Sequence, residues 1–171
     1  MNKLEQYSDE EWNKIAVLPQ LVGAIIAAAE SSGLVGSTKE MMATAKSFLG
    51  AKEKYPNNAL IQAIIPQTKD VDVVMEDVSE EKTRFENKIK EYEVKTKDEL
   101  TAKVLEDCKS AMVILKDKES EATISEYTTW LLEIAQNVAN AGTEGDFLGF
   151  GGVKYSDNEK TIVEALKEAL S

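Results

Sequence analysis

The segment from Gly145 to Gly152, Gly-Asp-Phe-Leu-Gly-Phe-Gly-Gly, has residue types that suit a ligand-binding loop. Glycines allow a backbone to approach a phosphate group closely, and the free amides of a following helix can donate hydrogen bonds to it. A phosphate loop of the nucleotide-hydrolase type requires Gly-Lys and then Ser or Thr after a strand, whereas residues 154–156 here are Lys-Tyr-Ser. Glu144 and Asp146 would also repel an anion. The sequence therefore disfavours nucleotide binding.

Phe147, Leu148 and Phe150 give this segment an apolar character that a loose linker does not need. We expect the three side chains to pack either on the protein's own core, where they would pin the final helix, or on a partner protein. The backbone freedom for a tight loop comes from four glycines, Gly145, Gly149, Gly151 and Gly152.

A second candidate for chemistry is the turn from Glu30 to Glu40, which joins two predicted helices and has a carboxylate at each end. It does not fit a calcium loop of the EF-hand type. With Gly33 at the sixth position of that loop, Ala28 would be first and Lys39 last, where carboxylates are required. Glu30 and Glu40 remain candidates for a cation site of another kind, although Glu40 is also placed to cap a helix.

Several reaction classes are excluded by residues that the chain lacks. It has no histidine, which is the commonest general base and the commonest metal ligand in proteins. Ser-His and Cys-His nucleophile pairs are therefore also excluded. Its single cysteine, Cys108, allows neither an intramolecular disulfide nor a cysteine-ligated zinc site, and we expect it to be packed in the core. No complete catalytic motif is present. We predict a protein that is not an enzyme and has no cofactor.

The net charge is −11, from 31 acidic and 20 basic residues, and Arg84 is the only arginine. Such a surface repels nucleic acid, whose binding depends on neutralising phosphates. The longest uncharged run, Ile15 to Ala29, is too short to span a bilayer and follows acidic residues rather than the basic start of a signal peptide. We therefore expect a cytoplasmic protein without a nucleic-acid or membrane partner.

Helix starts are marked by capping boxes, in which a hydroxyl accepts from the amide three residues on and an acid reaches back to the cap residue. The pairs are Ser8 with Glu11, Ser37 with Glu40, Thr96 with Glu99, and Ser156 with Glu159. Each is followed by an apolar pattern of helical period. These signals predict an all-α chain.

The apolar periodicity predicts a bundle of six or seven helices. We expect them near residues 8–31 with a bend or restart at Pro19, 37–54, 57–65, 71–92 as one helix or two, 96–115, 124–141 and 156–170. Short polar joints beside the later helices suggest antiparallel neighbours. One helical domain over residues 1–171 is the simplest arrangement. Within it, residues 1–67 could form an N-terminal subdomain, 68–141 an antiparallel bundle, and 142–171 a closing loop and helix.

Two resemblances add to this interpretation. Residues 145–156 with the closing helix, and Ser8-Asp9-Glu10-Glu11-Trp12 near the start, resemble a group of small uncharacterised helical proteins of bacteria and archaea, which implies no activity. The helix, glycine turn and acid-led helix around residues 30–40 are similar to the tellurite-resistance (TerB-like) proteins. That similarity implies a link to stress and cation binding through acidic residues. Here Glu-Ser-Ser-Gly at residues 30–33 replaces the expected Asp-Gly.

The leading hypothesis from the sequence is a non-enzymatic cytoplasmic protein that acts by association with a protein partner or with itself, through Phe147, Leu148 and Phe150. The alternative is a cation- or small-ligand-binding module of the stress-response type, which would use Glu30, Glu40 or acids near the glycine loop.

Overall fold

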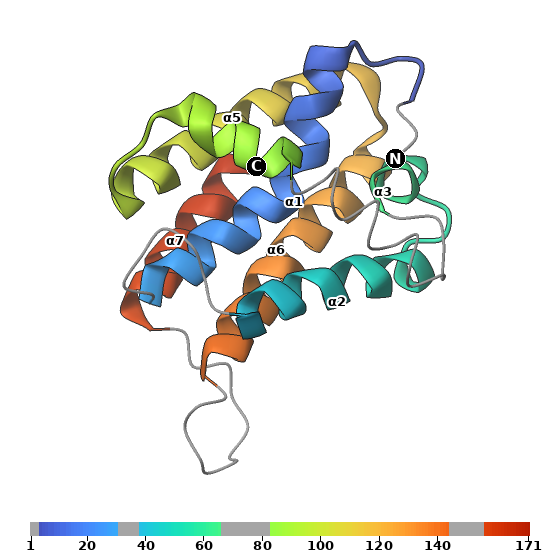
Figure 1. Ribbon diagram of the computed structural model, residues 1–171. Coiled ribbons are helices and arrows are strands. Elements are labelled where there is room, and N and C mark those ends of the chain that lie inside the picture. The colour runs from blue at the N-terminus through green and yellow to red at the C-terminus, as the bar shows by residue number, and fades with distance from the viewer. Residues whose placement is uncertain (1–3, 31–37, 66–82, 144–155) are drawn as a thin grey trace.

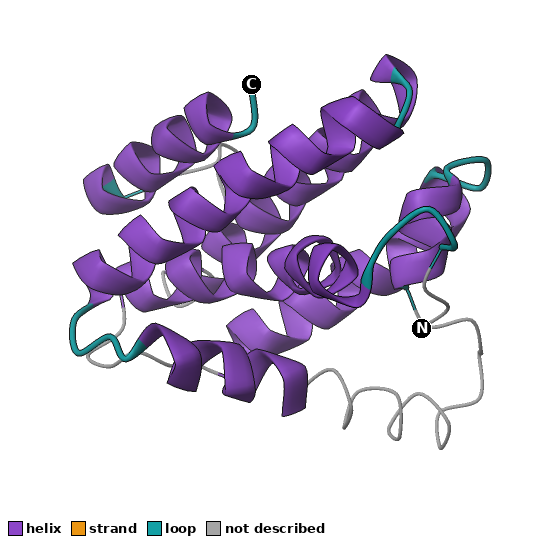
Figure 2. Cartoon of the chain, turned by 90° about the horizontal axis from the view of Figure 1, so that it is seen from above, coloured by secondary structure: helices purple, strands orange, loops and turns teal. Residues whose placement is uncertain are grey.

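The computed structural model describes residues 4–30, 38–65, 83–143 and 156–171, with the side chains of residues 30, 38–42, 45, 49, 142 and 143 outside that description. Within these ranges the chain is helical and contains no strand, which confirms the predicted all-α bundle (Figure 2). The helices are α1 (Asp9–Glu30), α2 (Thr38–Lys54), α3 (Ala59–Ile64), a helix at residues 83–92, α5 (Lys97–Lys118), α6 (Glu121–Thr143) and α7 (Asp157–Ala169).

Helix α1 lies at the centre of the bundle, where it packs against α5, α6, α7 and α2 (Figure 1). Its uncharged run from Ile15 to Ala29 is apolar on nearly every side, so neighbours can cover it from several directions. Residues Asp9–Ala29 are long and apolar enough to cross a membrane by length and composition, but 72% of that window is buried inside the bundle, as in the core helix of a folded domain. Helix α5 packs mainly on α1, and α6 packs on α2 and α1, so these two helices contact each other much less than the short joint between them suggested.

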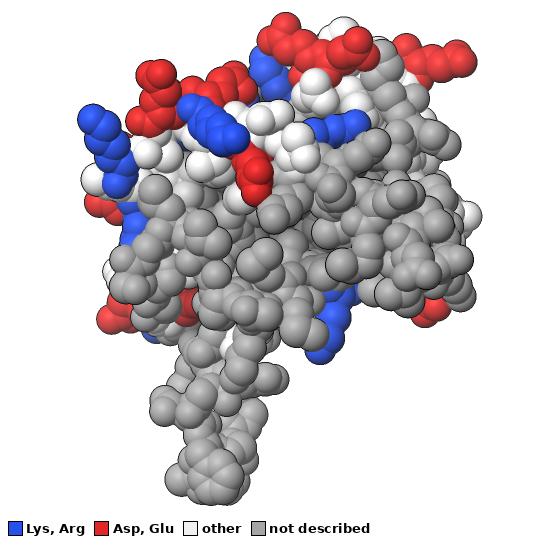
Figure 3. Space-filling model, in the orientation of Figure 1, with Lys and Arg blue, Asp and Glu red and all other residues white. Residues whose placement is uncertain are grey.

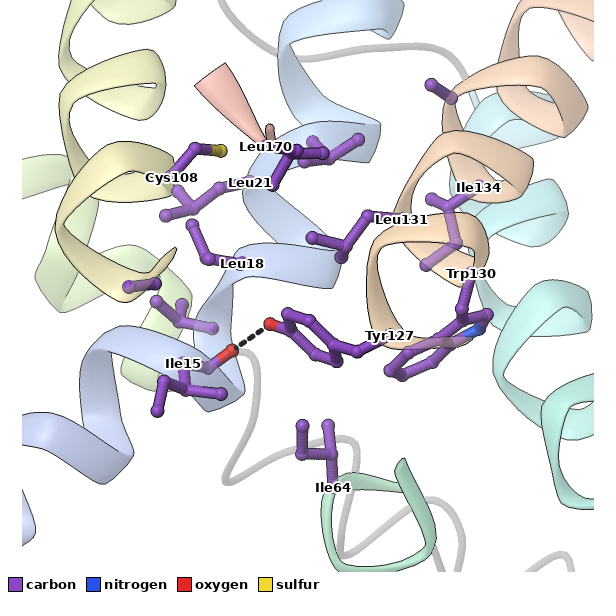
Figure 4. Packing of buried hydrophobic residues seen from close by; sticks show 14 of the residues in the cluster. Ile15, Leu18, Leu21, Ile64, Cys108, Tyr127, Trp130, Leu131, Ile134 and Leu170 are labelled. Atoms are coloured by element: carbon purple, nitrogen blue, oxygen red, sulfur yellow. Dashed lines mark hydrogen bonds between the residues drawn. The ribbon is translucent and has the colours of Figure 1, made fainter. Parts of the chain in front are cut away.

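The centre of α1 contains Pro19, and the helix continues through it to Glu30. Figure 1 shows that the two halves of α1 run in different directions. Proline has no amide hydrogen, so the carbonyl of Ile15, four residues earlier, loses its partner within the helix. The hydroxyl of Tyr127 on α6 donates a hydrogen bond to this carbonyl, with an oxygen–oxygen distance of 2.7 Å (Figure 4). The bend that the sequence predicted is thus stabilised from a neighbouring helix.

Helix α2 approaches α1 closely at Gly23. A Cβ atom added at this glycine would lie 2.7 Å from the hydroxyl oxygen of Thr44, closer than real contacts of this kind. Any larger residue at this crossing point would require the Thr44 side chain or one of the helices to move. The small residues around Gly23 permit this approach, and α1 and α2 are in contact.

The buried faces of α5 and α6 follow the predicted apolar stripes. On α5 the six apolar residues that repeat at helical spacing are all buried, Leu100, Val104, Cys108, Ala111, Met112 and Leu115. On α6 the fully buried members are Tyr127, Trp130, Leu131, Ile134 and Val138, while Ile124 and Ala141 are half-buried. Figure 4 shows side chains from several of these helices meeting in one cluster.

Three of the four predicted capping boxes are formed. The amide of Glu11 donates to the Ser8 hydroxyl at 3.2 Å and the amide of Ser8 to the Glu11 carboxylate at 2.8 Å. The boxes at the starts of α5 and α7 have the same two reciprocal bonds. The fourth, Ser37 with Glu40, lies outside the described residues and side chains.

Candidate functional site

The predicted contact residues Phe147, Leu148 and Phe150, and the four glycines around them, lie outside the described residues. The structure defines the two helices that the segment joins. Helix α6 ends at Thr143 and α7 begins at Asp157. The start of α7 is fixed by its own capping box, because the Ser156 hydroxyl accepts from the amide of Glu159 at 3.1 Å.

Helix α7 is anchored to the bundle by residues of its own. Its inner face packs against α5, α1 and α6. At its end, the Lys116 ammonium of α5 donates to the carbonyl of Ser171 at 2.7 Å. The buried apolar side chains are Val163, Leu166, Ala169 and Leu170. These contacts among the described residues anchor α7 along its length and at its C-terminal end.

Glu30 and Glu40, the candidate cation ligands, lie at the last residue of α1 and in the first turn of α2. The two helices contact each other. Their side chains lie outside the described part of the molecule. Among the residues that the structure describes, no group of three or more histidines, cysteines or acids could hold a metal ion.

The described residues contain three polar clusters of one design, here called the tyrosine latches. In each, a tyrosine hydroxyl donates to a carboxylate on another segment, and a lysine ammonium lies over the tyrosine ring. The hydroxyl–carboxylate pairs are Tyr7 with Glu119 at 2.5 Å, Tyr55 with Glu133 at 3.1 Å, and Tyr92 with Asp107 at 2.6 Å. The lysines over the respective rings are Lys118, Lys54 and Lys88.

The first latch ties the chain before α1 to the junction of α5 and α6. The Glu119 carboxylate accepts from both Tyr7 and Gln6, while the Lys118 ammonium donates to the Gln6 carbonyl at 2.9 Å and to the Glu11 carboxylate at 2.7 Å. The hydrogen bond from Lys118, together with that from the Ser8 amide, lowers the pKa of Glu11 to about 2. This carboxylate is therefore ionised throughout the neutral range.

The second latch ties the end of α2 to α6, where Lys54 and Tyr55 both contact Glu133. Next to it lies Asn58, which is only 2% exposed and caps α3. The Asn58 carbonyl oxygen accepts from the amide of Ile61 at 3.0 Å, and its amide nitrogen donates to the Thr123 carbonyl at 3.1 Å and the Glu126 carboxylate at 2.9 Å. Asn58 thus links α3 to the first turns of α6.

The third latch ties the helix at residues 83–92 to α5. The Asp107 carboxylate accepts from the Tyr92 hydroxyl and pairs with the Lys88 ammonium at 3.2 Å. The side chains of Lys88 and Asp107 are 16% and 15% exposed, so water screens this pair less than a surface pair.

The environments of these groups suppress nucleophilic chemistry. Burial raises the pKa of Tyr7, Tyr55, Tyr92 and Tyr127, and the carboxylates that accept from the first three raise it further. Burial also raises the pKa of the Cys108 thiol to about 12. The thiol and the four hydroxyls stay protonated near neutral pH, so they act as hydrogen-bond donors and packing groups.

The surface of the described residues carries charges of both signs. Figure 3 shows acidic and basic side chains interspersed on the face that it presents. Among the described residues, the one large apolar side chain that is exposed is Val113 on α5, at 72%. Every buried polar side-chain atom among them has a hydrogen-bond partner. Among the described residues there is thus no buried, unpaired polar side-chain atom that would require a ligand.

Sequence reasoning did not find the tyrosine latches or the links from Asn58 to α6. The partners of Tyr7 and Tyr55 lie 112 and 78 residues away along the chain, so no local pattern could reveal them. Asn58 precedes an apolar run, which is the signal of a helix cap, and its cap role could have been predicted. Comparison with protein-family models, curated proteins and solved structures finds no match to this chain.

Proposed function

We propose that this protein is a non-enzymatic cytoplasmic helical protein that acts by association with a protein partner or with a second copy, through Phe147, Leu148 and Phe150. The observation that carries the proposal is the anchoring of α7 by described residues. Its buried face, its capping box and the bond from Lys116 to Ser171 hold it on α5 and α1. Because described residues already anchor this helix, we assign the apolar side chains of the preceding segment to a partner rather than to the attachment of α7.

The chemistry of the described residues supports a role in association rather than catalysis. Tyrosine hydroxyls and cysteine thiols are among the side chains that serve as nucleophiles in enzymes. Here the tyrosines of the latches donate to carboxylates, and burial raises their pKa values and that of the thiol. A segment of residues 144–155 between two well-anchored helices is also longer than most helix–helix connections, and such segments are often functional.

The direct test replaces Phe147 and Phe150 by serine in one variant, with Val113→Ser on the exposed face of α5 as the matched control. Sedimentation velocity measures self-association, and proteins captured from extract are identified, purified and titrated against each variant by calorimetry. The proposal expects the double variant to lose the association at least tenfold in Kd while the control keeps it. It also expects the melting midpoint of the double variant to stay within about 2 °C of the parent.

A fall of the midpoint by more than about 8 °C in the double variant would contradict the proposal, because the phenylalanines would then belong to the core. The alternative of a cation-binding module is tested by measuring the melting midpoint of the parent protein with Ca²⁺, Mg²⁺, Mn²⁺ or Zn²⁺ added. A saturable upward shift with one cation, reversed by chelator and abolished in Glu30→Gln with Glu40→Gln, would favour that alternative.

A further inference from the structure

The helix at residues 83–92 differs from the other elements in how little of it is buried. None of these residues is fully buried, and its apolar side chains, Phe85, Ile89 and Tyr92, are only half-buried against the core. By contrast, α5, which follows directly, has six buried residues. Figure 1 shows the helix lying alongside α5. Its apolar contact with the bundle is therefore shallow, and burial stabilises it less than it stabilises α5.

The contacts of its C-terminal half converge on Asp107 of α5. The Tyr92 hydroxyl donates to the Asp107 carboxylate at 2.6 Å, and the Lys88 ammonium lies 3.2 Å from the same carboxylate and 5.0 Å from the centre of the Tyr92 ring. The charges of Lys88 and Glu91 also interact with those of Glu10 and Lys14 on α1. The helix thus lies near both α1 and α5, and Tyr92 and Lys88 fasten its C-terminal half to the Asp107 carboxylate.

The joint that follows the helix is strained. Glu93 has a φ angle of 52°, in the left-handed region, which costs a residue with a side chain roughly 1 to 2 kcal/mol. Three residues later α5 begins at a complete capping box of Thr96 and Glu99. The connection therefore has a fixed end on α5 and a strained residue directly after Tyr92. This is where a small change of backbone angles would swing the whole helix.

We propose that the helix at residues 83–92 is a hinged lid over α1 and α5, closed by the latch of Tyr92, Lys88 and Asp107. The lid opens about the Glu93 joint while the other helices remain folded. Opening exposes the apolar side chains Phe85 and Ile89 together with the strip of α1 and α5 beneath them. The latch thereby controls how much apolar surface the bundle shows, independently of residues 144–155.

Hydrogen exchange of the intact protein, resolved by peptide, tests the lid with two matched variants. Tyr92→Phe removes the hydroxyl that closes the lid. Tyr55→Phe removes the equivalent hydroxyl of the latch between α2 and α6, on an element that stays folded when the lid opens. The global stability of both variants is measured by urea unfolding.

The expected result is faster exchange of the amides at residues 86–92 in Tyr92→Phe, by roughly tenfold, because the open state is favoured by loss of a bond to a charged acceptor. Tyr55→Phe is expected to leave that exchange rate unchanged even though it lowers global stability. The exchange of the parent at these residues should also depend little on low urea, since a local opening exposes little surface.

The lid would be overturned if Tyr55→Phe accelerated exchange at residues 86–92 by the factor that its loss of global stability predicts, since these amides would then exchange only by global unfolding. It would equally be overturned if Tyr92→Phe left that exchange unchanged.

Discussion

Replacement of Tyr127 by phenylalanine is expected to destabilise the protein through a carbonyl on another helix. The hydroxyl of Tyr127 lies 2.7 Å from the carbonyl oxygen of Ile15, and both residues are fully buried. The amide that would normally donate to this carbonyl is missing because residue 19 is proline. Without the hydroxyl, the Ile15 carbonyl has neither a helix partner nor access to water.

The magnitude follows from the cost of an unpaired buried acceptor, about 1 to 3 kcal/mol. For a domain of this size, each kcal/mol moves the melting midpoint by roughly 2 to 4 °C. We therefore expect Tyr127→Phe to lower the midpoint by about 4 to 8 °C and to lower the free energy of unfolding in urea by about 2 kcal/mol. Tyr55→Phe is the matched control. Its acceptor, Glu133, is 30% exposed and can be hydrated, so a loss below about 1 kcal/mol is expected.

A second substitution decides whether the carbonyl is the cause. In Pro19→Ala the backbone regains an amide that can donate to the Ile15 carbonyl within α1. Tyr127→Phe is then expected to cost at least about 1 kcal/mol less in the Pro19→Ala background than in the parent. Equal costs in the two backgrounds, measured by urea unfolding, would refute the reasoning, because Tyr127 would then act through packing alone.

Three further substitutions probe other features. Asn58→Asp keeps the cap acceptor but loses both bonds donated to α6, so urea unfolding should show a loss of about 2 to 4 kcal/mol, whereas Asn57→Asp at the exposed neighbouring position should stay within about 0.5 kcal/mol. Glu93→Gly should raise the free energy of unfolding by up to about 1 kcal/mol, because glycine adopts the positive φ without strain, and the melting midpoint should rise with it. Glu91→Gly, inside the helix at residues 83–92, should lower the free energy of unfolding by a similar amount. The pKa of Glu11 is lowered to about 2, so its contribution to stability is present above about pH 4.5 and is lost as the pH falls toward 2. The stability difference between the parent and Glu11→Gln should therefore shrink over that interval, and a difference that grew would contradict the assignment.

The sequence was sufficient for those parts of the fold that depend on neighbours along the chain. Capping boxes are complete within four residues, and the stripes on α5 and α6 repeat at every turn, so Thr96, Ser156 and the buried face of α5 could be assigned from pattern alone. The close approach at Gly23 was likewise indicated by the small residues around it.

The features that were missed depend on partners far apart in sequence. Pro19 predicts a bend in α1. Only the fold shows that Tyr127, 112 residues from Ile15 along the chain, donates a hydrogen bond to the buried Ile15 carbonyl. The short joint between α5 and α6 predicts that these helices pack against each other, but each packs more extensively against α1 than against the other. The candidate site remains a prediction, because Phe147 and Phe150 lie outside the described residues and the neighbouring sequence does not indicate which surface their rings contact.

The central position of α1 has a consequence for how the chain folds during synthesis. Helix α1 is made first, whereas three of its main partners, α5, α6 and α7, begin at Lys97, Glu121 and Asp157. Its apolar surface therefore stays uncovered on the ribosome until more than half of the chain has emerged. Contacts between segments that are distant in sequence form slowly. Until they form, the partly synthesised chain exposes apolar surface that promotes aggregation. A nascent chain arrested before α5 is thus expected to require a chaperone, and release from that chaperone should coincide with the emergence of the last helix.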